Sequence, residues 1–228
     1  MPSFQDATPS PVTPIDFSRP ADEVAPRLIG AVIYRAGVGI RLTEVEAYLG
    51  EADPASHAFI GETSRNSTMF GPPQHLYVYA SYGVHRAGNL VCSPDGAAGG
   101  VLLRAGEVVI GADVARARRT AQQYSKDGRP RKTPKPPTEA GLARGPGNLG
   151  RALGLDLTVN GSAVVQVSSL PESLTSSDDA EQVLLQPGSP TRSVRGPRIG
   201  ISKNVEAPLR FWVPGDLTVT TPRSAPRT

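Results

Sequence analysis

Residues 38–49 read VGIRLTEVEAYL, and the alternation within them decides the fold. Side chains of a strand point to opposite faces in turn, so this stretch is predicted to form a strand. One face carries Thr43, Val45, Ala47 and Leu49. The other face carries Glu44, Glu46 and Tyr48, which places a carboxylate beside a tyrosine on the same strand.

Apolar spacing and turn residues predict the remaining strands and helices. Residues 76–82 and 84–92 are expected to form a β-hairpin around Tyr82-Gly83, and residues 101–105 a short buried strand. Other strands are expected at residues 163–167, 198–201 and 209–213, and helices at residues 20–33, 112–123 and 148–153. The prediction is an α+β fold, a single domain with a mostly antiparallel curved β-sheet, surrounding helices and a protruding β-hairpin.

The length of 228 residues suits one domain with a sizeable core. We expect a flexible tail over residues 1–15, the folded domain over residues 16–219 and a second flexible tail over residues 220–228. Within the domain, residues 125–140 are expected to form a flexible basic loop and residues 170–192 a Ser/Pro-rich loop.

Cysteine content and hydropathy bear on the compartment. The one cysteine, Cys92, excludes an internal disulfide and a thiolate metal cluster. No apolar stretch approaches the roughly 18 residues of a membrane span. The N-terminal residues 1–19 are acidic and proline-containing, unlike a signal peptide. We therefore expect a cytoplasmic protein with no membrane partner, associated with the nucleoid if its source is prokaryotic.

Basic residues are concentrated in one segment. Residues 116–144 hold nine Lys and Arg against two acidic residues, a local charge of +7 in a chain of net charge +3. Residues 155–191 hold five acidic residues and no Lys or Arg. Such a dipole suits a protein with one face on a polyanion, and a solvated basic loop would have the same composition.

Tyrosines gather close to the paired carboxylates. Four of the six tyrosines lie within residues 48–82, in a chain that is only 5% aromatic. Stacking surfaces beside a general base are what an enzyme needs to hold a flat ring and to cleave a bond at its edge. This window therefore predicts the functional site.

Spaced motifs within and beyond this window resemble one known family. In order, they are residues 44–48 (EVEAY), 55–57 (ASH), 65–71 (RNSTMFG), 77–83 (YVYASYG), 101–105 (VLLRA), 145–149 (GPGNL), 197–200 (PRIG) and 208–211 (PLRF). From about residue 18 to 214 the sequence resembles the alkyladenine (3-methyladenine) DNA glycosylase family, the type that also excises hypoxanthine and ethenoadenine. The resemblance implies a base excision repair enzyme that acts on double-stranded DNA containing damaged purines, without metal or other cofactor. We also expect a monomer, which suits a search along DNA.

The resemblance implies a role for each matching residue of the base-binding site. Glu46 would be the general base that activates water for attack on the sugar C1′. Tyr48, His57 and Tyr79 would line the pocket for the flipped base. Asn89 would exclude guanine by crowding its exocyclic amino group.

A second set of matching residues would act on the DNA itself. Tyr82 would be the wedge that enters the DNA stack from the hairpin. Arg104, counted with Glu46 in the catalytic set, would bracket the wedge and hold a backbone phosphate. Arg65 and Asn66 would also contact DNA, although their turn chemistry alone could explain them.

The chemistry is consistent with these roles. A base inside a duplex must be extruded before it can be cut out, and a side chain takes its place in the stack. Cleavage passes through an oxocarbenium-like state that one carboxylate and a water can serve. No lysine lies in the motif window to attack C1′ as an amine, so we expect a monofunctional hydrolase that leaves an abasic site.

Several alternatives remain open. Glu46 could be a structural carboxylate, Tyr77 could be a core residue, and Glu44 is interpreted as structural. The histidines lack the spacing of metal ligands, and Cys92 has no identified histidine partner. At the level of function, the rivals are a noncatalytic nucleic-acid binding module of the same fold and a hydrolase of free nucleosides.

Overall fold

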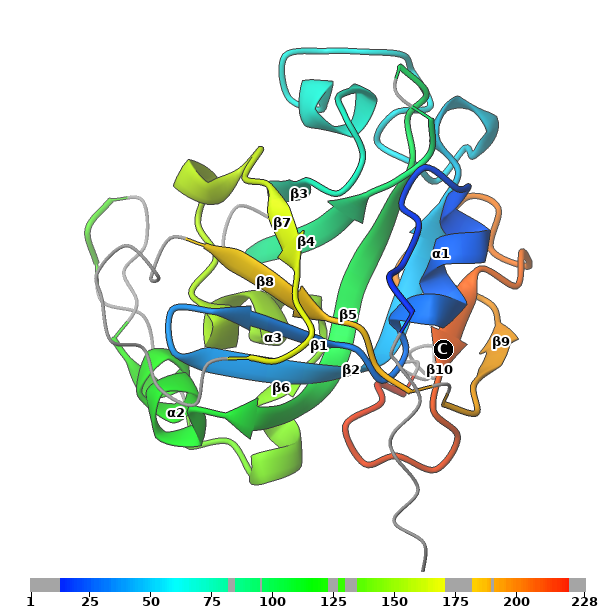
Figure 1. Ribbon diagram of the computed structural model, residues 1–228. Helices are drawn as coiled ribbons and strands as arrows, with labels where there is room; N and C mark the ends of the chain where they lie inside the picture. Colours follow the sequence, from blue (N-terminus) through cyan, green and yellow to red (C-terminus); the bar gives the residue numbers. More distant parts are fainter. Residues whose placement is uncertain are drawn as a thin grey trace, which may run out of the picture.

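The computed structural model describes residues 13–81, 85–94, 96–122, 127–129, 135–170, 182–189 and 191–221. Within these ranges the chain forms a curled, mostly antiparallel sheet with helices packed beside it, which confirms the predicted α+β fold (Figure 1). The helices are α1 (Ala21–Leu28), α2 (Ala112–Thr120) and α3 (Pro146–Leu153). The strands are β1 (Val32–Arg35), β2 (Val38–Tyr48), β3 (Leu76–Ser81), β4 (His85–Val91), β5 (Gly100–Ile110), β6 (Ala143–Arg144), β7 (Val164–Gln166), β8 (Val183–Gln186), β9 (Val194–Gly196) and β10 (Arg210–Trp212).

The sheet curls until its two ends approach one another. Its strands follow the order β3-β4-β5-β2-β1-β8-β7, with the two long strands β2 and β5 at its centre. A bridge between His75, next to β3, and Ala163, next to β7, links the two ends of this path. Strand β10 pairs with residues 44–46 of β2, beyond the part of β2 that pairs with β1. This curled sheet, a half-barrel, therefore brings the C-terminal part of the chain onto the carboxylate-bearing end of β2.

Strand β2 is buried on both faces. Thr43, Val45 and Ala47 are fully buried on one face, and Val45 and Ala47 belong to the main hydrophobic cluster. Glu44 and Glu46 on the opposite face are also fully buried. Both carboxylates therefore lie out of contact with bulk water.

Helix α3 packs closely on the hairpin strand β4. A Cβ atom at Gly150 would lie 2.0 Å from the carbonyl oxygen of Arg86, so the helix can approach the strand only because residue 150 has no side chain. This contact fixes the hairpin against the body of the domain.

The predicted helix over residues 20–33 ends early, at Leu28. Gly30 has φ +87°, and its N–H donates to Leu42 O at 2.8 Å, while Leu42 N–H donates to Ala31 O at 2.8 Å. These bonds start the pairing with β2, so residues 32–35 form β1 instead of helix. The helix prediction for Ile33 was therefore wrong because pairing with β2 outweighed the local pattern.

Other strand bounds also differ from the predictions. The strand predicted over residues 101–105 runs from Gly100 to Ile110 because it pairs along most of β2. The predicted Ser/Pro loop contains β8, which joins β1 and β7. No ladder forms over residues 198–201, where the backbone N–H of Ile199 donates to a carboxylate. The neighbouring strand is β9, at residues 194–196.

The domain ends and the predicted loops are described only in part. Ile15 is buried and its backbone bonds Gln166, and Thr220 bonds Glu44, so the folded domain includes both of these residues. The hairpin strands are confirmed, but residues 82–84 at its tip, with Tyr82, lie outside the described residues. Residues 125–126 and 130–134 of the predicted basic loop and much of residues 170–192 also lie outside the described residues.

A buried ion pair joins the chain after β2 to the chain after β9. Arg198 donates to both carboxylate oxygens of Asp53, at 2.5 and 2.9 Å, and to Ala47 O at 3.0 Å. Both side chains are fully buried. Burial alone would raise the pKa of Asp53, but hydrogen bonds from Arg198, Asn204 and the Ala55 N–H outweigh it and hold this pKa below its usual value.

Replacing Asp53 with Asn keeps the side-chain shape but leaves the Arg198 guanidinium buried without its counter-charge. We expect the free energy of unfolding to fall by about 3–5 kcal/mol, measured by urea denaturation with the fluorescence of Trp212. The matched change Glu23→Gln removes the partner of Arg19 in an exposed pair and should cost less than about 1 kcal/mol. A loss at Asp53 no larger than that at Glu23 would contradict the role of the buried pair.

Candidate active site

Arg104 reaches the carboxylate face of β2 through an irregularity in the β2–β5 ladder. Glu44 pairs with Ala105 and Val45 pairs with Leu103, so Arg104 is left without a partner in the register. Such bulges turn a side chain out of the regular alternation. The Arg104 guanidinium is thereby aimed at Glu44 and Glu46, to which it donates at 2.8 and 3.3 Å.

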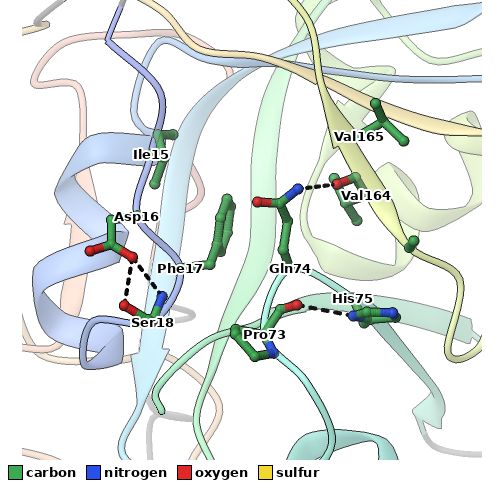
Figure 2. Close-up of a pocket in the computed structure, with 10 residues that line it drawn as sticks. Ile15, Asp16, Phe17, Ser18, Pro73, Gln74, His75, Val164 and Val165 are labelled. Atoms are coloured by element: carbon green, nitrogen blue, oxygen red, sulfur yellow. Dashed lines mark hydrogen bonds between the residues drawn. The ribbon is translucent and has the colours of Figure 1, made fainter. Parts of the chain in front are cut away.

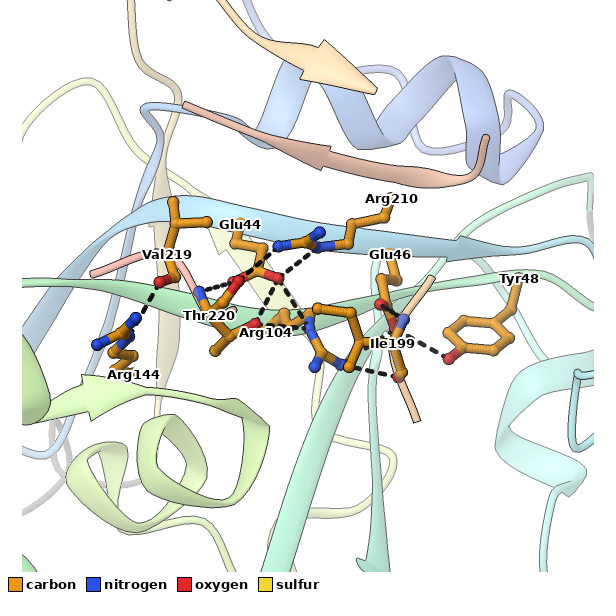
Figure 3. A network of polar contacts seen from close by, with 9 residues as sticks. All are labelled: Glu44, Glu46, Tyr48, Arg104, Arg144, Ile199, Arg210, Val219 and Thr220. Atoms are coloured by element: carbon orange, nitrogen blue, oxygen red, sulfur yellow. Dashed lines mark hydrogen bonds and ion pairs between the residues drawn. The ribbon is translucent and has the colours of Figure 1, made fainter. Parts of the chain in front are cut away.

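Glu46 accepts hydrogen bonds from three different segments. Its Oε1 accepts from the Ile199 N–H at 2.7 Å, and its Oε2 accepts from the Tyr48 hydroxyl at 3.1 Å and from Arg104 Nη1 (Figure 3). Burial raises the pKa of Glu46 above its usual 4.5, and nearby Glu44 adds to the rise. The charge of Arg104 and the bonds from Ile199 and Tyr48 oppose it. The outcome is a desolvated carboxylate with raised proton affinity.

Glu44 has a different environment on the same strand. Its Oε1 accepts from Arg104 Nε, from Arg210 Nε at 2.6 Å and from the Thr220 hydroxyl at 2.7 Å. Its Oε2 accepts from the Thr220 N–H at 2.6 Å. Both oxygens are therefore held by short bonds, and this supports the structural interpretation of Glu44.

Arg104 is a buried residue, 7% exposed. Besides the two carboxylates, its guanidinium contacts Ile199 O at 3.3 Å and Thr220 Oγ1 at 3.2 Å. These contacts place it within the carboxylate network. Its contact with a DNA phosphate stays a prediction.

The predicted pocket residues Tyr48, His57 and Tyr79 come from two elements and a loop. The His57 and Tyr79 rings meet edge to face with centroids 4.5 Å apart. Burial, then the nearby charge of Glu46 and the Tyr79 hydroxyl, raise the pKa of Tyr48 well above 10, so its hydroxyl keeps the proton that it donates to Glu46. On its other side, Tyr48 packs under the guanidinium of Arg198, 4.6 Å from the ring centroid.

Tyr77 belongs to this aromatic group, although the sequence left it as a core candidate. Its ring is buried and stacks on Tyr79 with centroids 5.7 Å apart, which confirms that the two share a strand face. Its hydroxyl is 3.1 Å from His57 Nδ1. Burial and the charge of Arg65 lower the pKa of His57, so its imidazole is neutral near pH 7. Tyr77 therefore holds His57 in place as well as filling the core.

Asn66 acts on the loop that carries His57. Its Oδ1 accepts from the backbone and hydroxyl of Thr63, and its Nδ2 donates to His57 O at 2.9 Å and Gly61 O at 3.0 Å. The side chain is 3% exposed, whereas Arg65 beside it is exposed. The DNA contacts of both residues stay predictions, and the bonds of Asn66 favour a role in shaping the loop.

Asn89 lies on β4, opposite Tyr77 in the hairpin ladder. It is 5% exposed, and its Nδ2 is 3.4 Å from Tyr77 O. Its part in excluding guanine stays a prediction. The same is true of Tyr82 as the wedge, since that residue lies outside the described part of the chain.

Sequence reasoning missed the groups that complete the network from distant segments. They are the Ile199 N–H, Arg198 with Asp53, Arg210 and Thr220. The motif at residues 197–200 was a signal for the first two, but it carried no role. Nothing local to Thr220 indicates that it bonds a carboxylate.

The remaining described residues offer little for a metal site, a membrane span or a reactive thiol. Among the described residues, no group of three or more His, Cys, Asp or Glu side chains could hold a metal ion. None of the described helices has the length and apolar character of a membrane span. Cys92 is buried, and burial raises the pKa of its thiol to about 12. A hollow of about 500 Å³ lies between Phe17, Gln74 and Val164, and none of the predicted site residues lines it (Figure 2).

The sequence matches one family of known proteins over most of its length. Residues 15–217 match the model of the family described as methylpurine-DNA glycosylase. A Corynebacterium jeikeium protein named "Putative 3-methyladenine DNA glycosylase" is 60% identical over 92% of this chain and 91% of its own length. Proteins with the same name are 51% identical in Corynebacterium glutamicum, over 94% of this chain and 99% of theirs, and 50% identical in Cutibacterium acnes, over 92% and 100%. The chain belongs to the methylpurine-DNA glycosylase family, and is thus a DNA repair hydrolase of the N-glycosyl bond.

Proposed function

We propose that this protein is a monofunctional DNA glycosylase that flips alkylated or deaminated adenine-type purines out of duplex DNA. In this proposal Glu46 takes a proton from water as the water oxygen bonds the sugar C1′. The purine leaves with the electrons of the N-glycosidic bond, and an abasic site remains for base excision repair.

The environment of Glu46 is the observation that carries the proposal. A general base must be charged at the working pH and still have an affinity for the proton. Burial supplies the affinity, since it raises the pKa, and the donors from Arg104, Ile199 and Tyr48 keep the charged form accessible. A noncatalytic binding module would gain nothing from a buried carboxylate facing a polyanion.

The aromatic group supports a flat, electron-poor ligand. Tyr48, His57 and Tyr79 offer ring faces and edges on which an extruded base can stack, at roughly 1–3 kcal/mol per base. A neutral His57 does not repel a cationic alkylated base, and tyrosine faces attract it. The relatives above are named for 3-methyladenine, which is such a base.

The remaining roles concern DNA. We assign Tyr82 as the wedge because it follows directly after β3 in the hairpin. Asn89 discriminates against the guanine amino group. Arg65, near the loop that carries His57, contacts the DNA backbone. Residues 116–144 add salt-sensitive affinity for DNA. The protein works as a monomer in the cytoplasm on double-stranded DNA, without a cofactor.

The same network supports hydrolysis without strand cleavage. Glu46 is bonded by a guanidinium, a phenol and a backbone N–H, none of which is an amine that could form a covalent intermediate at C1′. The product is therefore an intact strand with an abasic site.

Replacing Glu46 with Gln should strongly slow base release. We expect the single-turnover rate on duplexes containing hypoxanthine, ethenoadenine or 7-methylguanine to fall at least about 100-fold, the usual contribution of a general base. Abasic sites are revealed by alkali. The matched change Glu51→Gln, at an exposed carboxylate after β2, should leave the rate within about twofold of wild type.

Two results would contradict this mechanism. Equal release by wild type and the Glu46 variant would mean that another group activates water. Binding of damaged duplex by both proteins with release by neither, on all three bases, would favour the noncatalytic binding module.

The raised pKa of Glu46 predicts an acid limb in the pH profile. The carboxylate must be charged, so the rate should fall roughly tenfold per pH unit below a pKa that lies above 4.5. A duplex with 3-methyladenine is the suitable substrate because this cationic base leaves without taking a proton and has no guanine amino group for Asn89 to reject. Tyr48→Phe removes a donor to the charged form and should move this limb to higher pH. A limb that moves to lower pH would contradict the assignment.

A further inference from the structure

The chain after β10 forms a strap across the carboxylate end of β2. We define this strap as residues 216–220. Thr218 Oγ1 lies 2.6 Å from Thr43 Oγ1, and Val219 O accepts from Arg144 Nε at 2.9 Å. The match to the family model ends at residue 217, so the last part of the strap lies beyond it.

Thr220 uses every polar group it has on the charged network. Its N–H and hydroxyl donate to the two oxygens of Glu44, at 2.6 and 2.7 Å, and its carbonyl oxygen accepts from Arg210 Nη2 at 2.7 Å (Figure 3). Its Oγ1 is also 3.2 Å from Arg104 Nε. Since a carboxylate only accepts and a guanidinium only donates, the hydroxyl donates to Glu44 and accepts from Arg104.

The Thr220 hydroxyl thus lies between Glu44 and Arg104, and the charges of both these residues affect the pKa of Glu46. Arg104 divides its donors between Glu44, at 2.8 Å, and Glu46, at 3.3 Å. When Arg210 and Thr220 also donate to Glu44, this carboxylate attracts the Arg104 guanidinium less strongly. An acceptor at Thr220 also helps to fix the orientation of the guanidinium.

We propose that Thr220 is a positioning residue for the catalytic base: its hydrogen bonds stabilise and orient Glu44, so that Arg104 stays within reach of Glu46. This inference rests on the proposed function, in which Glu46 is the base. It adds to that site a residue from the C-terminal end of the chain.

The direction of the effect follows from all the charged groups that face Glu46. They are Glu44 and Tyr48 from β2, Arg104 from β5, Arg198 from the segment after β9 and Arg210 from β10, whose side chain bonds Glu44. Without the Thr220 hydroxyl, the charge of Glu44 is less compensated and Arg104 is drawn toward it. Both changes disfavour the charged form of Glu46, so its pKa should rise.

The test compares Thr220→Val with Thr218→Val in the full chain. Both changes replace a hydroxyl by a methyl in the same strap, but only Thr220 contacts Glu44 and Arg104. The pKa of Glu46 is read from its carboxyl ¹³C chemical shift, a measurement that needs no activity, with Glu46→Gln to assign the resonance. The acid limb of single-turnover release is measured in parallel, together with the melting temperature of each variant.

We expect Thr220→Val to raise both the pKa of Glu46 and the acid limb by about half to one pH unit, or roughly 3–10-fold in rate on that limb. Thr218→Val should move neither, whatever its effect on melting. Thr220→Ser should restore the wild-type values. If Val at residue 220 prevents folding, Thr220→Ser and Thr220→Ala differ only in the hydroxyl and give the same comparison.

An unchanged pKa of Glu46 in Thr220→Val, or an equal shift in Thr218→Val, would overturn the proposal. If the carboxyl pKa rises and the acid limb does not follow, the positioning role stands and Glu46 is not the base. The two measurements therefore separate a failure of this inference from a failure of the proposed function.

Discussion

One guanidinium shared by two buried carboxylates governs the rest of this structure. Glu44 and Glu46 lie on the same face of β2 with no exposure, and placing two negative charges there is strongly unfavourable unless they are compensated. Arg104 reaches both because the ladder between β2 and β5 is irregular at its position. The fold must then bring further donors to these oxygens, and they come from the segments after β9 and β10.

The division of those donors explains how two equal carboxylates differ in chemistry. Glu44 receives four bonds of 2.6–2.8 Å, from Arg104, Arg210 and twice from Thr220. Glu46 receives one bond of 2.7 Å and two longer ones of 3.1 and 3.3 Å. The longer bonds to Glu46 only partly offset the effect of its burial, which raises its pKa. The less satisfied carboxylate is the one beside the aromatic group.

Local patterns predicted those parts of the molecule that depend on neighbours in sequence. The alternation over residues 38–49 identified β2 and placed Glu46 and Tyr48 close together on it. Prediction failed where distant pairing decided the outcome: Gly30 and Ala31 enter the ladder with Leu42, which ends α1 and begins β1. It also failed where a backbone group is the hydrogen-bond donor, as the Ile199 N–H is to Glu46. No residue pattern records a donor that every amino acid except proline carries.

The separations of these contacts in sequence link the environment of Glu44 and Glu46 to completion of the fold. Arg104 lies 58 residues from Glu46, Ile199 lies 153 residues from it, and Thr220 lies 176 residues from Glu44. Until the last segments dock, the carboxylates of β2 lack most of their donors, and water must solvate them in their place. The environment of Glu46 and of its neighbour Glu44 is therefore complete only when the segments after β9 and β10 have docked on β2.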